Sequence, residues 1–448
     1  MPEIRLTKAE LLSALSHALD MVEGQPPGHA TRTALIAQRI AREIGLGEEE
    51  QSSLFFASLL KDAGCSNNSA RIHKMFGGDE FISKREVKLI DWASPVESIK
   101  FALRHTERGG TVASKLRRML SNVGSPQQVM DEVTQARCTR GAEIALMLGF
   151  DQATSDAIRD LDEHWDGRGS PRHKKGEETG VLARILCLSQ TLEVFVTALG
   201  RSAAYDMLTS RRGSWFDPGL VQAAFAFAGD EAFWEDNAVR AEDATLHLPL
   251  PATASIAEDA DIDQVCYAFA LIIDAKSSFT AEHSSRVTQY ATELGASFGF
   301  DPARLQTLRW AALLHDIGKL GVSNSILDKP GRPTDEEFAA IRRHPLFSFE
   351  ILSRVRGFER VAEIAAAHHE RLDGRGYYRG LSGTQLDTEM RILAVADVYD
   401  ALSADRPYRA AMPPEKVFAI LDEESVAGLD AEVVGRLREM KLGMSLAA

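Results

Sequence analysis

The sequence predicts an all-α protein that contains two copies of one helical domain. No segment of the 448 residues shows the sustained alternation of apolar and polar residues that is typical of a half-buried strand. Apolar residues recur instead at helical spacing, as in the stretch from His283 to Phe298. Similar segments also follow one another in the same order in both halves of the chain, which indicates an internal duplication.

The duplication rests on several paired segments. GHATRTALIAQRIAREIGL, from Gly28, pairs with EHSSRVTQYATELGASFGF, from Glu282. FFASLLKDAG pairs with RWAALLHDIG, DEHWDGRGSP with HERLDGRGYY, and LARILCLSQTLEVF with EMRILAVADVYDAL. The later pairs have a shorter offset than the first, so the N-terminal copy carries about 47 additional residues between Cys65 and Arg137.

These pairs divide the chain into two tandem domains and a linker. We expect the first domain at residues 1–241, with an insertion near 66–136, and the second at 262–448. Residues 242–261 lack helical periodicity and are rich in Ala, Asp and Pro, so they are predicted to form the linker.

Helix signals can be placed in order along the second copy. Asp301 and Pro302 look like an N-cap followed by proline at the first helical position, opening the helix that runs to HDIGK. The stretch TDEE, from Thr334, fits a capping box. His344-Pro345 should break or restart that helix. FERVAEIAAAHHE and TEMRILAVADVYDALSAD are predicted as further helices, separated by the glycine-rich loop LDGRGYYRGLSG.

Composition limits the classes of function and the compartment. The net charge of −14 argues against a broad surface for polymeric nucleic acid, which needs an excess of Lys and Arg. The four cysteines form no CxxC pair and are interpreted as reduced, buried thiols. No signal peptide is evident, and no apolar run approaches the ~18 residues of a membrane span. We therefore expect a soluble, cytoplasmic protein without a membrane span.

Seven potential metal ligands are concentrated in the second copy. Any one of its histidines alone is more simply a hydrogen-bonded core or surface residue. However, His315 and Asp316 are neighbours, His368 and His369 are a tandem pair, and Asp397 lies in an apolar run where a carboxylate is costly unless it is paired or bound to a cation. The candidate ligands are His283, His315, Asp316, His344, His368, His369 and Asp397.

The residue types indicate which chemistry such a cluster would support. Neighbouring residues on a helix project about 100° apart, and the carboxylate of Asp316 has two oxygens that can bridge two cations. Mixed imidazole and carboxylate ligation suits Fe or Mn, with Zn, Ni, Co or Mg as alternatives. Two divalent metal ions would hold an activated hydroxide and polarise a phosphoryl group. Lys319 is placed to neutralise phosphate oxygens, although a lysine at a helix C-terminus is also favoured by the helix dipole alone.

With these motifs in order, the second copy resembles the HD-GYP family of the HD phosphohydrolase superfamily. The resemblance rests on His283 in AEHSSRV, on HDIGK, on His344, on HHERLDGRGYY and on AVADVYDALSADRPYR, and it covers about residues 262–430. It implies two tandem HD-type helical domains, two or three metals, and hydrolysis of cyclic di-GMP or a related cyclic dinucleotide. It also implies that the seven residues above are the ligands, with Asp316 as the bridging carboxylate. The implied substrate contacts are Lys319, Tyr377, Arg406 and Arg409.

Two departures from the family pattern affect the expected reaction. The Gly-Tyr-Pro signature reads Gly376-Tyr377-Tyr378, so the proline is lost while the glycine and the first aromatic ring remain. Members with three metals use a glutamate where this chain has Phe279, which cannot bind a metal. The resemblance therefore implies a two-metal site and leaves open whether hydrolysis stops at the linear dinucleotide.

The N-terminal copy is predicted to be catalytically inactive. It keeps His29 and Asp62, but the remaining ligand positions hold other residues, and the cations among them would repel a metal. Those residues are Lys61, Arg137, Leu161, Asp162 and Gln190. This copy could sense a ligand, form a dimer contact or dock a signalling protein. The letters GGDEF, from Gly77, are interpreted as chance, because no mixed α/β domain surrounds them.

The leading hypothesis is a metal-dependent phosphodiesterase that converts cyclic di-GMP to linear pGpG, with a further step to GMP left open. Asp316 and Lys319 would be its catalytic residues. A phosphodiesterase for another cyclic dinucleotide is a related alternative. A non-catalytic receptor or signalling adaptor is the second class, in which the altered Gly-Tyr-Tyr loop has ended catalysis. The complete ligand set favours the enzyme, since an adaptor has no physical reason to keep it.

Overall fold

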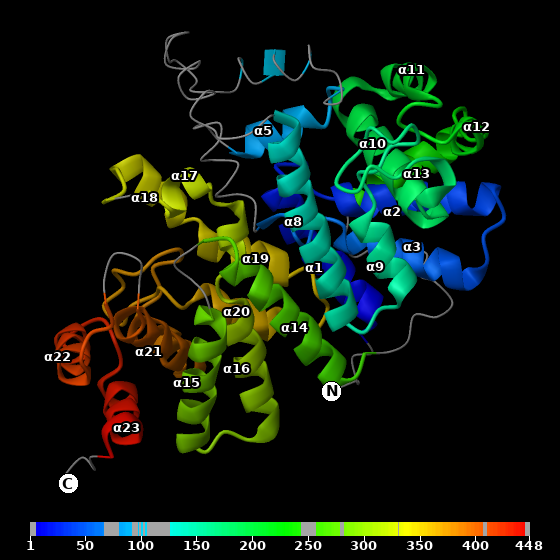
Figure 1. Cartoon of the computed structure of the whole chain (residues 1–448). Helices are drawn as coiled ribbons and strands as arrows, with labels where there is room; N and C mark the ends of the chain where they lie inside the picture. The colour runs from blue at the N-terminus through cyan, green and yellow to red at the C-terminus, as the bar shows by residue number, and fades with distance from the viewer. Residues whose placement is uncertain are drawn as a thin grey trace. The chain divides into compact units, whose positions relative to one another are not determined.

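A computed structural model confirms the all-α fold (Figure 1). It describes residues 6–66, 80–91, 97, 100–101, 104, 126–242, 257–277, 282–329, 331–405 and 410–443. Within these ranges there is no β-strand, although isolated bridges occur, among them Asp166–Lys175 and Arg212–Phe216. The described residues up to Ile262, with Ser323–Ser325, form one compact unit, and those from Asp263 onward form a second. We call them the N-terminal and the C-terminal unit.

The helices of the N-terminal unit pack around the apolar helix α10. In chain order they are α1 (Lys8–Val22), α2 (His29–Glu43), α3 (Glu48–Leu60), α5 (Glu80–Val87), α8 (Pro126–Met147), α9 (Gln152–Arg159), η1 (Gly176–Glu178), α10 (Val181–Leu199), α11 (Arg201–Arg211), α12 (Pro218–Phe225) and α13 (Glu231–Glu242). Helix α10 contacts α2, α3, α9, α11 and α12.

The C-terminal unit is built in the same way around α21. Its elements are α14 (Asp259–Asp274), which begins four residues before the unit, α15 (His283–Ser297), α16 (Pro302–Leu314), η2 (Ile317–Gly321), α17 (Asn324–Leu327), whose first two residues are assigned to the N-terminal unit, α18 (Asp335–Ile341), α19 (His344–Leu352), α20 (Glu359–Ala366), η3 (Gly383–Gln385), α21 (Thr388–Ser403), α22 (Pro414–Glu424) and α23 (Ala431–Leu442). Helix α21 contacts α15, α16, α20, α22 and α23.

Corresponding helices make corresponding contacts in the two units. The pairs α2–α3, α2–α10, α3–α9 and α8–α9 of the N-terminal unit recur as α15–α16, α15–α21, α16–α20 and α19–α20 of the C-terminal unit. The repeated sequence segments therefore adopt the same packing scheme.

The predicted helix starts are confirmed where a local signal sets them. The side chain of Asp301 accepts a hydrogen bond from the backbone N–H of Arg304, and Pro302 is the first residue of α16. Thr334 and Glu337 form the expected capping box, and α19 starts at His344. The end of α16 differs from the prediction, because the helix stops at Leu314 and the chain continues into the 3₁₀ turn η2. His315 and Asp316 therefore lie at a junction and not on one continuous helix.

A glycine allows η2 to approach α19. A Cβ atom on Gly318 would lie 2.0 Å from the backbone oxygen of His344 and 2.7 Å from the backbone nitrogen of Ser348. Real Cβ atoms essentially never come this close to backbone, so only glycine fits without a shift. This contact brings Asp316 and His344 together from separate elements.

One helix corrects the expectation that no apolar run is long enough for a membrane span. By length and composition, α10 could cross a membrane, and within the described ranges it is the single helix to pass that test. Its 18-residue window is 72% buried inside the protein. This burial is what the central helix of a packed domain shows, so the length of α10 is weak evidence for a span.

Several sequence predictions lie outside the described residues. They concern Gly77, Phe279, Arg406, Arg409, most of the inserted segment 66–136 and most of the proposed linker 242–261. The domain bounds 1–241 and 262–448 also stay a prediction.

Candidate metal centre

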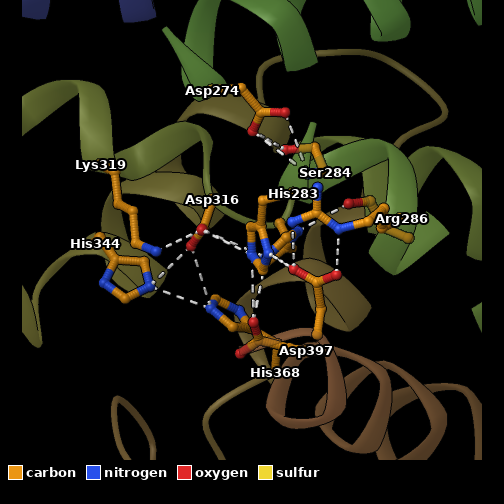
Figure 2. A network of polar contacts seen from close by, with 12 residues as sticks. Asp274, His283, Ser284, Arg286, Asp316, Lys319, His344, His368 and Asp397 are labelled. Carbon is orange, nitrogen blue, oxygen red and sulfur yellow. Dashed lines mark hydrogen bonds and ion pairs between the residues drawn. The ribbon is translucent and has the colours of Figure 1, made fainter. Parts of the chain in front are cut away.

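The structure brings all seven predicted ligands together inside the C-terminal unit. Figure 2 labels five of them, His283, Asp316, His344, His368 and Asp397. Most of them stand where a helix begins or ends. His283 and His344 open α15 and α19, His315 and Asp316 follow α16, His368 and His369 follow α20, and Asp397 lies within α21. Six of the seven side chains are buried, and His369 is partly exposed. Residues spread along the second copy thus meet at one point in the unit.

Asp316 lies at the middle of the cluster and presents its two oxygens to different histidines. Its Oδ2 is 3.4 Å from Nε2 of His315 and 3.7 Å from Nε2 of His283. Its Oδ1 is 3.4 Å from Nε2 of His344 and 3.6 Å from Nε2 of His368. A bridging carboxylate needs this arrangement, with one oxygen for each of two neighbouring cations.

Asp397 adds a second carboxylate to the side of Asp316 that faces His283. Its Oδ1 is 3.3 Å from Nε2 of His283 and 4.0 Å from Nε2 of His315. Its Oδ2 lies 3.9 Å from Nδ1 of His369. Ligand atoms of His283, His315 and Asp397 all lie within 4.8 Å of one another. The same holds for the group of His344, His368 and His369.

Three of the histidines are oriented by the backbone three residues earlier. Nδ1 of His315 lies 2.8 Å from the backbone oxygen of Ala312. The corresponding distances are 2.7 Å from His344 to Ile341 and 2.6 Å from His368 to Ala365. A carbonyl oxygen can only accept, so Nδ1 must donate and the neutral ring has its lone pair on Nε2. Hydrogen bonds of this kind fix the tautomer of metal-binding histidines. All three Nε2 lone pairs therefore face Asp316.

Two buried atoms in this cluster lack a hydrogen bond. They are Nε2 of His315 and Oδ1 of Asp316, both among the described residues. A buried polar atom without a partner costs about 1–3 kcal/mol, so such atoms are rare in folded proteins. Both atoms carry lone pairs, and because His315 lies on the Oδ2 side of Asp316, a cation on each side of this carboxylate would satisfy both. The side chains present therefore fit a pair of divalent cations, one on each side of Asp316.

At His315, His344 and Asp316 the protein environment favours the protonation states that metal binding needs. Burial lowers the pKa of His315 to about 4 and that of His344 to about 3, so both rings are neutral at pH 7. Burial alone would raise the pKa of Asp316, but the Lys319 ammonium and the imidazoles hold it well below its usual range. His283 differs from its neighbours. Burial works against its charged form, but hydrogen bonds to carboxylates raise its pKa to about 9.

The structure describes two of the four predicted substrate contacts, Lys319 and Tyr377. The ammonium of Lys319 pairs with Oδ2 of Asp316, and the lysine side chain is 24% exposed. The ring of Tyr377 lies 4.8 Å from the ring of His369, at the partly exposed side of the cluster. Arg406 and Arg409 lie outside the described residues.

Two contacting residues were missed in the sequence. Asp400 contacts His283, and Arg286, which Figure 2 labels, donates hydrogen bonds to Asp400. Both recur in the N-terminal copy, as Arg32 and Glu193. Comparison of polar positions between the two copies could have found them.

In the N-terminal unit, side-chain cations lie where the other unit places ligand atoms. Nζ of Lys61, the counterpart of His315, is 2.9 Å from Nε2 of His29 and also forms an ion pair with Asp62. Arg137, the counterpart of His344, pairs with Asp162. Burial disfavours the charged form of Asp62, but the Lys61 ammonium lowers its pKa to about 2. The buried carboxylates are thus neutralised without a metal.

Comparison with known proteins agrees with this geometry. A family model described as "HD domain" matches residues 118–220 and 268–433. The 3'3'-cGAMP-specific phosphodiesterase 3 of Vibrio cholerae is 40% identical over 436 residues, which are 96% of this chain and 94% of that protein. The 3'3'-cGAMP-specific phosphodiesterase 1 of the same organism is 30% identical over 77% of this chain and 81% of its own length.

Two further similarities differ in how much of this chain they cover. A cyclic di-GMP phosphodiesterase of Thermotoga maritima is 39% identical over 35% of this chain and 43% of its own length. A crystal structure of a cyclic GMP-AMP-specific phosphodiesterase of Vibrio cholerae covers 98% of both chains, with a TM-score of 0.67 and 34% identity. With the ligand cluster and the duplicated helical fold, these similarities show that the chain belongs to the HD-GYP family of the HD phosphohydrolase superfamily.

Proposed function

We propose that the C-terminal unit is a two-metal phosphodiesterase that opens a cyclic dinucleotide to the linear dinucleotide. The observation that carries the proposal is the position of Asp316, whose two oxygens face different pairs of histidines. When bound, two divalent cations would supply a nucleophilic water and polarise the phosphoryl group. Imidazole and carboxylate donors suit Fe or Mn best, with Zn, Ni, Co or Mg as alternatives.

Each side of Asp316 would hold one cation. His283, His315 and Asp397 form the ligand set on one side, and His344, His368 and His369 form the set on the other. Lys319 would neutralise phosphate oxygens, because its ammonium already lies at the centre and its side chain is partly exposed. Tyr377 would give a base or sugar an aromatic surface beside His369. Arg406 and Arg409 remain proposed phosphate contacts.

The proposed reaction is a simple hydrolysis. The oxygen of a water molecule forms a bond to phosphorus, the bond from phosphorus to the 3' oxygen breaks, and that oxygen takes up a proton. The product is a linear dinucleotide with a 5'-phosphate. We expect the reaction to stop largely at this product, because Phe279 occupies the position where relatives with three metals have a glutamate.

The relatives favour 3'3'-cGAMP over cyclic di-GMP as the first substrate to test. The relatives that match this chain over both units are named as cGAMP-specific. The relatives named for cyclic di-GMP match about a third of this chain, as does one further relative named as cGAMP-specific. We therefore propose 3'3'-cGAMP as the preferred substrate and keep cyclic di-GMP, the prediction from the sequence, as the second candidate.

The test is hydrolysis by the purified full chain, loaded with Mn²⁺ or Fe²⁺ at low oxygen. Each cyclic dinucleotide is added separately, and linear products are followed by liquid chromatography and mass spectrometry. We expect linear products, formed faster from 3'3'-cGAMP. The double variant His315→Ala, Asp316→Ala should lose turnover while its circular dichroism stays helical. Normal turnover in that variant would reject the proposed centre.

A non-catalytic receptor is the competing function, and the loss of proline at Tyr378 is the observation that favours it. A receptor would bind a cyclic dinucleotide without conversion, whichever of the metals above is supplied. That result would replace the enzyme assignment. For the N-terminal unit, ligand sensing, a dimer contact and partner docking stay proposals.

A further inference from the structure

His283 is oriented differently from the three histidines held by backbone carbonyls. Its Nδ1 lies 2.7 Å from Oδ2 of Asp400, a carboxylate with no exposed surface. The carboxylate can only accept here, so Nδ1 donates and Nε2 is directed toward Asp316 and Asp397. A charged acceptor also holds the ring more strongly than a neutral carbonyl does.

Asp400 is held in turn by Arg286. Nε of Arg286 donates to Oδ1 of Asp400 at 2.6 Å, and Nη2 donates to Oδ2 at 2.9 Å. Arg286 stands three residues after His283 on α15, and Asp400 stands three residues after Asp397 on α21. His283 and Arg286 therefore lie on one face of α15, and Asp397 and Asp400 lie on one face of α21. The His–Asp–Arg contact ties the helix that presents His283 to the helix that presents Asp397.

The same three-residue contact exists in the N-terminal unit, where most positions of the seven-ligand set hold other residues. Nδ1 of His29 contacts Glu193, and Nε of Arg32 donates to Oε1 of Glu193 at 2.6 Å. Glu193 is also buried. The two copies thus differ at the positions of most metal ligands but keep the carboxylate and the arginine. What differs is the group facing Nε2 of the histidine, which is the Lys61 ammonium in this unit.

We infer that Asp400, braced by Arg286, is a positioning residue that sets the metal affinity of the centre through the orientation of His283. The inference rests on the proposed two-metal function. Groups that hold a ligating histidine in this way typically change metal affinity by about 10–100-fold when they are removed. Asp400 itself is not assigned to a metal.

The primary test replaces the acceptor without changing its size. In Asp400→Asn, an NH₂ group replaces one of the two carboxylate oxygens. Because His283 and Arg286 both donate to Asp400, this NH₂ group must face one of these donors, which is unfavourable. The dissociation constant for Mn²⁺ is measured by titration calorimetry on the full chain, and bound metal is counted after dialysis against a chelator. We expect Asp400→Asn to weaken Mn²⁺ binding about 10–100-fold. Asp400→Glu, which introduces the residue of the other copy, should recover part of the loss.

The N-terminal copy provides the matched control. Glu193→Gln disrupts the same kind of buried contact away from the proposed centre, so it should lower thermal stability and leave the Mn²⁺ dissociation constant unchanged. Arg286→Gln is a second variant, because the Arg286 side chain is 31% exposed and its replacement spares the core. It should weaken Mn²⁺ binding by a smaller factor. If Asp400→Asn does not fold, Arg286→Gln decides the inference.

The outcomes separate this inference from the proposed function. Wild-type Mn²⁺ affinity in both Asp400→Asn and Arg286→Gln would overturn the positioning role, even if the enzyme hydrolyses its substrate. Equal loss of Mn²⁺ in Glu193→Gln would also overturn it. If affinity falls as expected but the wild-type chain converts no cyclic dinucleotide, the positioning role stands and the enzyme assignment fails.

Discussion

The Nε2 atoms of His344 and His368 lie 3.1 Å apart. Both rings use Nδ1 to contact a backbone carbonyl, so in the neutral rings two lone pairs face each other across this distance. Such a contact is repulsive unless a positive group lies between or beside the two nitrogens. It is therefore a place where binding of a cation would relieve an unfavourable contact and stabilise the fold.

Metal removal should lower the stability of the C-terminal unit. A ligand at 100 times its dissociation constant stabilises the folded state by about 2.7 kcal/mol, and the relief of the His344–His368 contact acts in the same direction. Differential scanning calorimetry of chelator-treated protein, with and without added Mn²⁺, measures the change in Tm. The variant His344→Ala should show a smaller shift. Equal Tm values for wild-type protein with and without metal would contradict the proposed centre.

Lys61 should be important for the stability of the N-terminal unit but not for metal binding. The variant Lys61→Met leaves the buried carboxylate of Asp62 without its nearest cation, and breaking a buried ion pair costs about 3–5 kcal/mol. Denaturant unfolding measures this loss, while elemental analysis should show unchanged metal per chain. Replacement of the exposed Lys175 by Met is the control and should change the free energy of unfolding by less than about 0.5 kcal/mol. A stable Lys61→Met protein would mean that the ammonium is not needed at this position.

Gly376 should tolerate no side chain, because the loop at the centre folds back tightly. A Cβ atom on Gly376 would lie 2.4 Å from Cα of Glu370 and 2.6 Å from the backbone nitrogen of Arg371. We expect Gly376→Ala to lower the free energy of unfolding by about 1–3 kcal/mol. It should also lower the metal content, because the backbone it would displace, at Glu370 and Arg371, directly follows the ligand His369. At Gly180 a Cβ atom would meet nothing within 4 Å, so Gly180→Ala is the control. Full metal content and stability in Gly376→Ala would show that the loop can shift freely.

His164 should make the N-terminal unit sensitive to acid. The buried ring stacks on Trp215, and burial lowers the pKa of His164 to about 3. Because the unfolded chain binds the proton near pH 6.5 and the folded chain does not, stability is complete above that pH and is lost as the pH falls toward 3. Between pH 6.5 and pH 5 the loss is about 2 kcal/mol.

The variant His164→Phe keeps a ring against Trp215 and removes the titrating group. Between pH 7 and pH 5, the free energy of unfolding should fall in both proteins, and the fall should be smaller in the variant. The difference between the two falls should be about 2 kcal/mol, the contribution of His164. Denaturant titrations at both pH values, followed by tryptophan fluorescence, measure the difference. An identical pH dependence in the two proteins would show that His164 is not the acid-sensitive group.

The sequence alone determined the fold class, the duplication, several helix starts and the set of candidate ligands. A helix start such as Thr334 depends on a hydrogen bond to a residue three positions away, so its signal is local and can be read from the chain. The repeat and the ligand set were also visible, because both are patterns of residue type along the sequence.

Only the tertiary structure decided which oxygen of Asp316 faces which histidine, and that Asp400 contacts His283. It also decided that α10, long enough for a span, is the central helix of its unit. These relationships depend on how helices distant in the sequence pack, and residue spacing carries no such information. Side chains some 115 positions apart, from His283 to Asp397, meet because the apolar faces of α15, α16, α20 and α21 bury one another.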